Sequence, residues 1–334
     1  MSESHTTTIV LAIAGTLLLL ILIATFMFAR KYRNHYRSSR LSEDETSPYE
    51  LVTMDIVNSS EYNWGNLPAL KLDGDFLTPI ERLSNGKFYE IWEGVYKYEP
   101  VLIKGLIPRR KTKLYIQNFI NTIKTMSTCH HPCILSVIGV AWSNPLDIQY
   151  VLEFMNMGSL RAVLEASATD SFAWHHKVNC ILNVAEGLAY LHNRRLIHGA
   201  VNTKNILIDT VKESKLGNIG LSKEEVLGSI SSGVWWMAPE MLVAGQYSSA
   251  IDIYALGMIL VELDSHRKPS KPWHLTKATI DHIVQEETMS PRFSTMCPTW
   301  IQDLAMLCIA RKPNHRPSAA VVVDIIRSKI DMII

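Results

Sequence analysis

The chain has 334 residues, of which 47% are hydrophobic and 19% charged, and its formal net charge is +1 with histidine neutral. This length and apolar content allow one or two domains with a large buried core. The near-neutral balance excludes a chain that is basic or acidic overall, so composition gives no indication of nucleic acid as a partner. Five cysteines without regular spacing favour reduced thiols over a disulfide framework.

An apolar run, Ile9 to Ala29, contains no charged residue. As a helix of 21 residues it would span about 31 Å, which is enough to cross the hydrocarbon core of a bilayer. A cleaved signal peptide would carry basic residues before a shorter apolar run, whereas here Arg30, Lys31 and Arg33 follow it. We therefore expect a retained transmembrane helix over 9–29. The positive-inside rule places residues 1–8 outside and the remainder in the cytosol, as a single-pass membrane protein.

Two further regions follow this run. Residues 30–75 are basic at their start, then acidic and polar, which predicts a flexible juxtamembrane linker. Residues 76–330 are mixed, with short strand-like runs first and long amphipathic helices after them, such as Ile181 to His192. The composition of this last region predicts a compact α+β domain.

Several short motifs occur in this region, and they can be given together: Val101-Leu102-Ile103-Lys104, Glu153-Phe154-Met155, His198 to Leu207, Ala238-Pro239-Glu240, Asp252 and Arg316. In order and spacing they resemble the motifs of protein kinases. Trp236-Met237 before Ala238 is most similar to the tyrosine-kinase-like serine/threonine group. The resemblance implies a bilobal kinase fold with a β-rich N-lobe over 76–152, a hinge over 153–157 and a helical C-lobe over 158–330.

The stretch His198 to Leu207 resembles the catalytic loop of that family, H-R-D-L-K-x-x-N-I-L. His198 and Asn205 match it, but Ala200 stands at the position of the Asp and Asn202 at that of the Lys. In the family, the Asp accepts the proton of the substrate hydroxyl and orients it for attack. A methyl group does neither, so no catalytic position here is intact.

The nucleotide site of the family is also altered. Of the loop G-x-G-x-F-G only the middle glycine, Gly86, remains, and Tyr89 replaces the third, which hinders close approach of phosphates. If a nucleotide were used, the resemblance implies contacts from Lys104, Gly86, Glu153, Met155 and Leu207.

The adenine position has a bulkier neighbour than the family's alanine, because Leu102 occupies it. We hypothesise that Leu102, together with Ile91 and Leu207, fills part of the adenine site.

The lysine at position 104 lacks its usual partner. In the family a Glu on the following helix pairs with this lysine, but the alignment puts Thr122 there, and no Asp or Glu occurs from Arg109 to Val140. Lys104 can therefore equally be a strand lysine without a special role.

The metal positions of the family carry amides. Asn218 replaces the Asp that bridges magnesium to the phosphates, and Asn205 is the second ligand. Two neutral ligands are a poor magnesium site, because Mg²⁺ gives up its water reluctantly. Glu224 and Glu225 follow nearby and are expected to be solvated.

Four positions of the family's framework are kept. Asp252 is expected to hold the backbone of the catalytic loop, Glu240 to pair with Arg316, and His198 to pack between the lobes. These roles are structural and involve no chemistry.

We interpret the chain as a membrane-anchored cytosolic pseudokinase that binds a protein partner, such as an active kinase, and no nucleic acid. The alternative is a weak or unconventional serine/threonine kinase that uses Lys104 and Asn205 with ATP and magnesium. A third reading keeps ATP as a structural ligand without turnover. The enzyme reading has to account for Ala200, Asn218 and Thr122 together.

Overall fold

The computed structural model describes residues 59–169, 171–221, 225, 236–244, 247–268 and 291–330. The predicted transmembrane run Ile9–Ala29 lies outside these residues. Within the described ranges, no helix combines the length and apolar composition needed to cross a bilayer. The chain divides into two units at Thr53, and all the described residues belong to the second unit.

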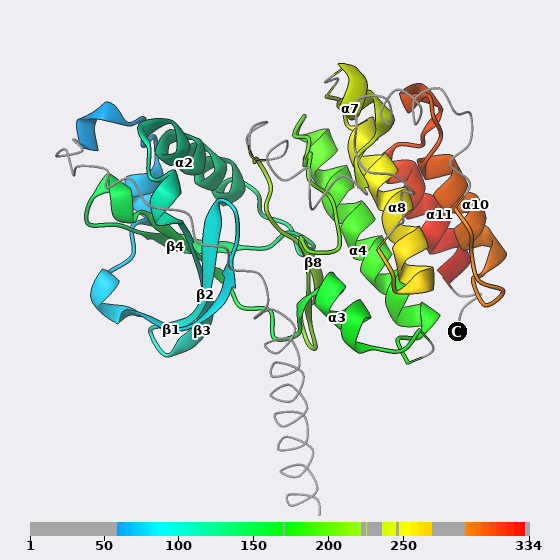
Figure 1. Ribbon diagram of the computed structural model, residues 1–334, viewed down its shortest axis with the longest axis horizontal. Helices are drawn as coiled ribbons and strands as arrows, with labels where there is room; N and C mark the ends of the chain where they lie inside the picture. Colours follow the sequence, from blue (N-terminus) through cyan, green and yellow to red (C-terminus); the bar gives the residue numbers. More distant parts are fainter. Residues whose placement is uncertain are drawn as a thin grey trace, which may run out of the picture. The chain divides into compact units, whose positions relative to one another are not determined.

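The smaller lobe is built on an antiparallel sheet of five strands in the order β1-β2-β3-β5-β4. The strands are β1 (Leu77–Asn85), β2 (Tyr89–Tyr96), β3 (Glu99–Leu106), β4 (Val137–Ala141) and β5 (Gln149–Glu153). Helix α2 (Lys113–Ser127) lies along this sheet (Figure 1). Its apolar residues recur at helical spacing, so that Ile116, Phe119 and Ile123 are fully buried.

Residues 59–75, expected to belong to a flexible linker, are folded onto the smaller lobe instead. They form the short 3-10 helices η1 (Ser59–Glu61) and η2 (Leu67–Leu70) and lead into η3 (Gly74–Phe76). Leu67 is fully buried, and Leu72 donates its backbone N–H to Val140 of β4. The expectation of a linker up to residue 75 was wrong here, because a few apolar residues anchor a segment that is polar on average.

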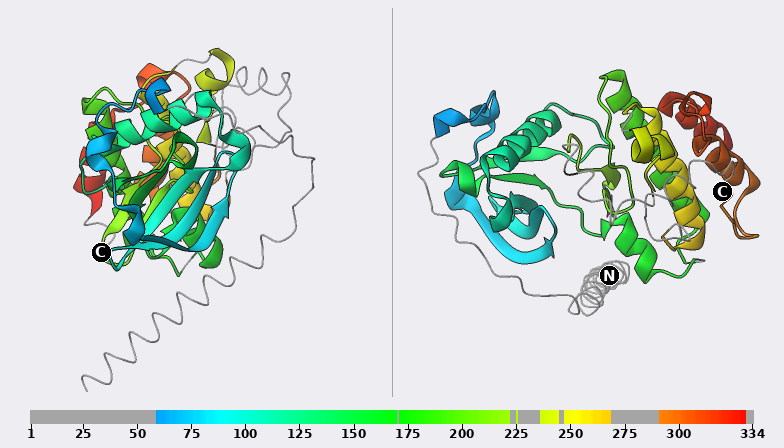
Figure 2. Two further views of the ribbon diagram at one scale, coloured as in Figure 1. Left: turned by 90° about the vertical axis from the view of Figure 1, so that its left-hand side faces the viewer. Right: turned by 45° about the horizontal axis from the view of Figure 1, so that its top comes forward.

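The larger lobe is mainly helical. Its elements are β6 (Gly158–Ser159), α3 (Leu160–Ala166), α4 (Trp174–Asn193), β7 (Ile206–Asp209), β8 (Glu213–Leu216), α7 (Pro239–Ala244), α8 (Ala250–Ser265), α10 (Thr299–Cys308) and α11 (Ala319–Lys329). Further 3-10 turns in the two lobes are η4 (Pro108–Arg110), η5 (Pro145–Asp147) and η7 (Pro313–His315). Helix α8 is buried along almost its whole length, with α4 and α10 packed against it (Figures 1 and 2). A helix that is apolar on all sides belongs in the centre of a domain.

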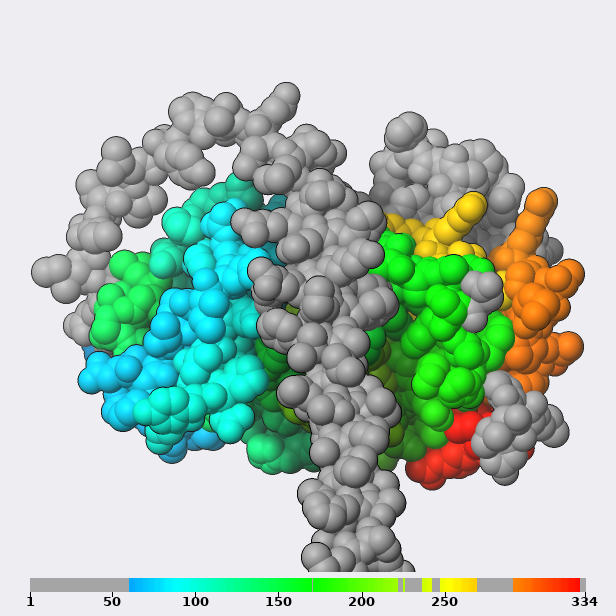
Figure 3. Space-filling view, turned by 90° about the horizontal axis from the view of Figure 1, so that it is seen from below, coloured from blue at the N-terminus to red at the C-terminus, as the bar shows by residue number. Residues whose placement is uncertain are grey.

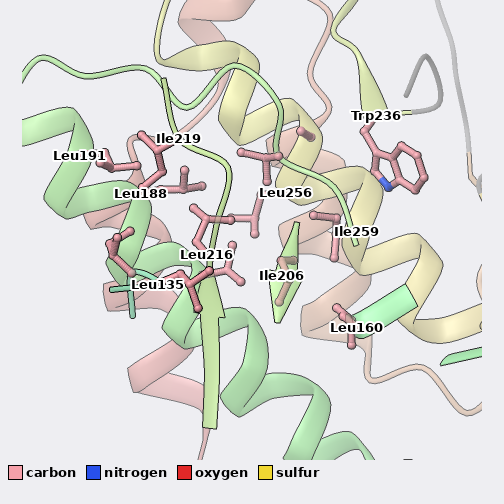
Figure 4. Close-up of a cluster of buried hydrophobic side chains, with 14 of the residues drawn as sticks. Leu135, Leu160, Leu188, Leu191, Ile206, Leu216, Ile219, Trp236, Leu256 and Ile259 are labelled. Carbon is pink, nitrogen blue, oxygen red and sulfur yellow. The ribbon is translucent and has the colours of Figure 1, made fainter. Parts of the chain in front are cut away.

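A continuous apolar core joins these helices to the strands below the site. Leu188 and Leu191 of α4, Leu216 of β8 and Leu256 of α8 converge around Ile219 (Figure 4). This core fixes the ends of β7 and β8, and the loops that follow them carry the candidate site.

The two-lobed arrangement predicted from the resemblance is confirmed: a β-sheet lobe is followed by a helical lobe. The first sheet ends at Glu153 and the second begins at Gly158, on either side of the expected hinge. Seen from below, the sheet lobe (blue to green) lies on the left and the helical lobe (green to red) on the right (Figure 3).

Candidate functional site

A cavity of about 450 Å³ lies among the loops where the sheet lobe and the helical lobe meet. It is lined by the turn after β1, by strand β3, by the loop 199–205 and by the beginning of helix α8. Lys104, Ala200, Asn205 and Asn218 all contribute to its wall, so the structure brings together residues far apart in sequence. The cavity therefore corresponds to the phosphate and catalytic end of the site that the resemblance implied.

Lys104 is buried in this wall, with only 3% of its surface exposed. Its ammonium group donates to Asn218 Oδ1 at 2.7 Å and lies 4.0 Å from the centre of the Tyr89 ring. Burial lowers the pKa of Lys104 from 10.5 to about 7. The lysine thus has a neutral amide and an aromatic face as neighbours in place of a carboxylate.

Thr122 stands where the family has a glutamate that pairs with the β3 lysine, but it forms a hydrogen bond to Gly220 and not to Lys104. It lies on the buried face of α2, and its hydroxyl donates to the Gly220 carbonyl at 2.9 Å. This bond connects helix α2 of the sheet lobe directly to the segment that follows β8. Thr122 therefore connects the two lobes and does not pair with Lys104.

The two candidate metal ligands bond each other. Asn218 Nδ2 donates to Asn205 Oδ1 at 2.7 Å, and Asn205 Nδ2 donates to the Ala200 carbonyl at 2.7 Å. Because Lys104 occupies Asn218 Oδ1, both amide oxygens already accept a hydrogen bond. This pair does not fit a magnesium ion, which needs oxygen ligands free to coordinate and prefers anionic ones.

Among the described residues, no group of three or more His, Cys, Asp or Glu side chains could hold a metal ion. Cys129 and Cys133 are buried free thiols, and burial raises the pKa of both.

The loop around Ala200 is closed by its own side chains. Asn202 Nδ2 donates to the Ala200 carbonyl at 2.9 Å, and Asn202 Oδ1 accepts the backbone N–H of Lys204 at 2.9 Å. An amide can make both bonds at once, whereas a lysine at position 202 could only donate. Asn202 therefore stabilises the turn and leaves no cation there to meet a phosphate.

The turn after β1 is held down by aromatic packing. Gly86 donates its N–H to the Tyr89 carbonyl at 2.8 Å, which closes a tight turn. The Tyr89 ring stacks on Phe119 of α2, with ring centres 5.3 Å apart, and Phe88 is buried beside Tyr115. The ring that sequence reasoning placed in the way of phosphates also fixes this turn to the helix.

Apolar side chains stand at the adenine end of the expected site, and one of them, Ile91, lines the cavity. Leu102 belongs to the buried core, and Leu207 and Ile91 pack against that core. Met155 is buried, and neither it nor Leu102, Leu207 or Glu153 lines the cavity.

Glu153, the first hinge residue of the sheet lobe, forms an ion pair with Lys215 of the helical lobe. Its carboxylate accepts from Lys215 Nζ at 2.8 and 2.9 Å and from the Ser136 backbone N–H at 2.8 Å. This pairing links the hinge to β8 and was not expected from the sequence.

Glu225 was expected to be solvated, but it is buried. Its side chain is 1% exposed and lines the cavity. Sequence reasoning missed it because a pair of glutamates after an apolar strand is typical of a solvated turn. No local pattern signalled that one of them turns inward.

The framework residues lie where the resemblance implied. The two oxygens of Asp252 accept the backbone N–H groups of His198 at 2.9 Å and Gly199 at 2.8 Å. Gly199 has a φ of +74°, and a β-carbon there would lie 3.1 Å from the Tyr247 ring. Together with the His192 ring, which lies 2.9 Å from Asp252, these bonds fix the start of the loop.

A second framework contact is the ion pair between Arg316 and Glu240. Its two hydrogen bonds measure 2.6 and 2.9 Å, and Arg316 also donates to the carbonyls of Ala250 and Ala310. His198, Ile219 and Met126 are all buried, the His198 Nε2 atom lies 2.9 Å from the Gly217 carbonyl oxygen, and burial lowers the pKa of His198. The helical lobe thus retains the contacts that the family's architecture requires.

The comparisons with known proteins agree with this geometry. Residues 77–326 match the family described as "Protein tyrosine and serine/threonine kinase". The chain is 27% identical over 254 residues to the "Probable serine/threonine-protein kinase kinX" of Dictyostelium discoideum, covering 74% of this chain and 22% of that protein. It is also 27% identical over 256 residues to the megakaryocyte-associated tyrosine-protein kinase of Rattus norvegicus, covering 76% and 53%. The chain therefore spans less than two thirds of the length of these relatives.

Proposed function

The chain belongs to the protein tyrosine and serine/threonine kinase family, and from this premise we propose that it is a pseudokinase acting through protein binding. The observation that carries the proposal is the hydrogen-bonded line from Lys104 through Asn218 and Asn205 to Ala200. In this line every group that phosphoryl transfer would use is either absent or already bonded to its neighbour.

The electrostatics of the cavity support this proposal. Phosphoryl transfer requires a metal to neutralise the phosphates, a positioned lysine and a group that orients the nucleophile. Here the amide pair carries no negative charge and each of its oxygens already accepts one hydrogen bond, burial lowers the pKa of Lys104 to about 7, and Ala200 has no polar side chain. Because burial favours its neutral form, Lys104 attracts phosphate less strongly than an exposed lysine does.

The same contacts supply a way to act without catalysis. The Lys104–Asn218 bond and the Thr122–Gly220 bond both join the sheet lobe to the helical lobe. Side chains of the chain itself therefore join the two lobes directly. We infer that the protein presents one fixed arrangement of its lobes to a partner, and that an active kinase is such a partner.

A membrane location is part of this proposal. The uncharged run Ile9–Ala29 and the basic residues after it support an anchor, with the kinase-like domain in the cytosol.

The second candidate function is a weak serine/threonine kinase, and Glu225 is the observation that favours it. This buried carboxylate lines the same cavity as Lys104 and Asn205. A carboxylate in that position can accept a proton or attract a cation, although it does not stand at a catalytic position of the family.

A phosphate-transfer assay on the full chain separates the two functions. The chain is incubated with ATP labelled at the γ-phosphate, Mg²⁺ or Mn²⁺, and a general protein substrate. We expect no transfer above the level of a Lys104→Met variant prepared in the same way. Transfer that disappears in both Lys104→Met and Glu225→Gln would establish the kinase and overturn the pseudokinase.

A further inference from the structure

No acidic residue occurs between Glu99 and Asp147, a stretch that contains β3, α2 and β4. Its Lys and Arg residues, in a chain whose net charge is only +1, are Lys104, Arg109, Arg110, Lys111, Lys113 and Lys124. Lys104 is buried, but the other five reach the surface. Positive charge is thus concentrated on the side of the sheet lobe that carries α2, at the upper edge of that lobe in Figure 1.

Four of these residues and Lys87 form what we call the basic patch: Lys87, Arg109, Arg110, Lys111 and Lys113. The two turns that carry the patch meet at Phe88. Arg110 lies 4.7 Å and the Lys87 ammonium 5.9 Å from the centre of the Phe88 ring. The backbone N–H of Ile107 also donates to the Phe88 carbonyl at 3.1 Å.

The basic patch lies at the N-terminus of helix α2, where positive charge destabilises a helix. Thr112 precedes the helix without forming a side-chain cap, and the first turn contains Lys113 and no acidic residue. Helix N-termini carry partial positive charge and favour acidic residues. Glu61 pairs with Lys113, but no acidic residue in the turn itself offsets Arg109, Arg110 and Lys111. Departures from such local rules are expected where a surface serves a function.

The patch also carries an exposed apolar side chain. Leu114, directly after Lys113, is 61% exposed. Of the basic patch only Lys87 also lines the cavity of the candidate site, and none of residues 109–114 does. Glu61 of η1 accepts an ion pair from Lys113 at 2.7 Å, which shows that a carboxylate can be held at its edge.

We propose that the basic patch binds the anionic headgroups of a lipid bilayer. Several cations on two turns, with one exposed aliphatic side chain next to Lys113, match a charged surface with an apolar layer beneath it. A bilayer needs no pocket, and each Lys or Arg close to an anionic surface strengthens adsorption about fivefold. This inference does not depend on whether the cavity transfers phosphate.

Amide hydrogen exchange of the full chain on vesicles tests the proposal. One set of vesicles contains phosphatidylcholine alone, and the other contains phosphatidylserine as about a third of its lipid. We expect residues 107–117 to exchange more slowly on the anionic vesicles, and this protection to weaken at high salt because exposed charges are screened.

Two double variants with the same change in charge identify the surface responsible. Arg109→Glu with Lys111→Glu is expected to remove the protection, because losing two cations alone weakens adsorption about 25-fold. Arg267→Glu with Lys268→Glu, in the exposed turn after α8, is expected to leave it unchanged. Equal exchange on both vesicle types, or equal loss of protection in both variants, would overturn the proposal. Protection by soluble polyglutamate without protection by anionic vesicles would overturn the lipid as partner.

Discussion

Around Asp252 and Arg316 the charged side chains bond to charged or backbone partners, whereas in the cavity neutral groups stand where the family has charges. Arg316 still meets Glu240, and Asp252 still holds two backbone N–H groups. In the cavity, by contrast, Asn218 and Thr122 bond to Lys104 and to Gly220. Within the site, the side chains of Lys104, Asn218 and Asn205 bond to one another.

This difference indicates that the two regions serve different requirements. Contacts in the framework keep the helical lobe folded, and removing one partner would leave a buried charge uncompensated. Contacts in the cavity connect two lobes that a nucleotide and metal would otherwise bridge. The comparison can be tested by breaking one contact at a time in each region.

The largest effect is expected in the framework, from Arg316→Met. The Arg316 side chain is fully buried and its partner Glu240 is 10% exposed, so the variant should lower the free energy of unfolding by about 3–5 kcal/mol. Urea denaturation measures this change. The matched control is Arg327→Met, whose pair with Glu186 is largely exposed at 62% and 24% and should cost less than about 1 kcal/mol. An equal decrease in the free energy of unfolding in both variants would contradict the expected difference between the buried and the exposed ion pair.

A smaller effect is expected from the titration of Lys104 in the cavity. Its pKa is about 7 in the folded chain and 10.5 ordinarily, so between these values the unfolded chain binds one proton more. The free energy of unfolding should therefore rise with pH from about 7 upward, by about 1 kcal/mol per pH unit, and this stabilisation is lost as the pH falls through 7. Unfolding curves from pH 6.5 to 9 should show the slope in the wild type and lack it in Lys104→Met. A Lys104→Met variant with the same slope would show that another group titrates.

The smallest effect is expected from the bond that joins the lobes through α2. Thr122→Val keeps the shape of the side chain and removes its donor to Gly220, at a cost of about 1–2 kcal/mol. Thr125→Val on the same helix removes only a bond to the Asn121 carbonyl one turn earlier and should cost less than about 0.5 kcal/mol. Hydrogen exchange of α2 should accelerate in the first variant alone, and acceleration in both would mean that the helix end frays independently of Gly220.

The fold could be predicted from the sequence to a larger extent than the site. Ordered motifs from Lys104 to Arg316 indicated both lobes, and helical spacing located α4. The segment 59–75 could not be recognised, because its anchoring depends on contacts with α2 and β4 that are distant in sequence.

For the site, the sequence showed which charges were missing but not what replaced them. The line from Lys104 through Asn218 to Asn205 depends on side-chain directions, which have no sequence signal. The inward turn of Glu225 was likewise unpredictable, since a neighbouring glutamate has the same local context.

Thermal unfolding of the full chain with and without ATP and Mg²⁺ tests the central claim most directly, which is that the chain's own side chains have replaced the nucleotide and metal. A ligand that binds only the folded state at a hundred times its Kd stabilises it by about 2.7 kcal/mol. We expect no shift in the wild type, and a shift once Tyr89→Gly and Leu102→Ala open the two ends of the site. A magnesium-dependent stabilisation of the wild type that is lost in Lys104→Met would contradict the claim.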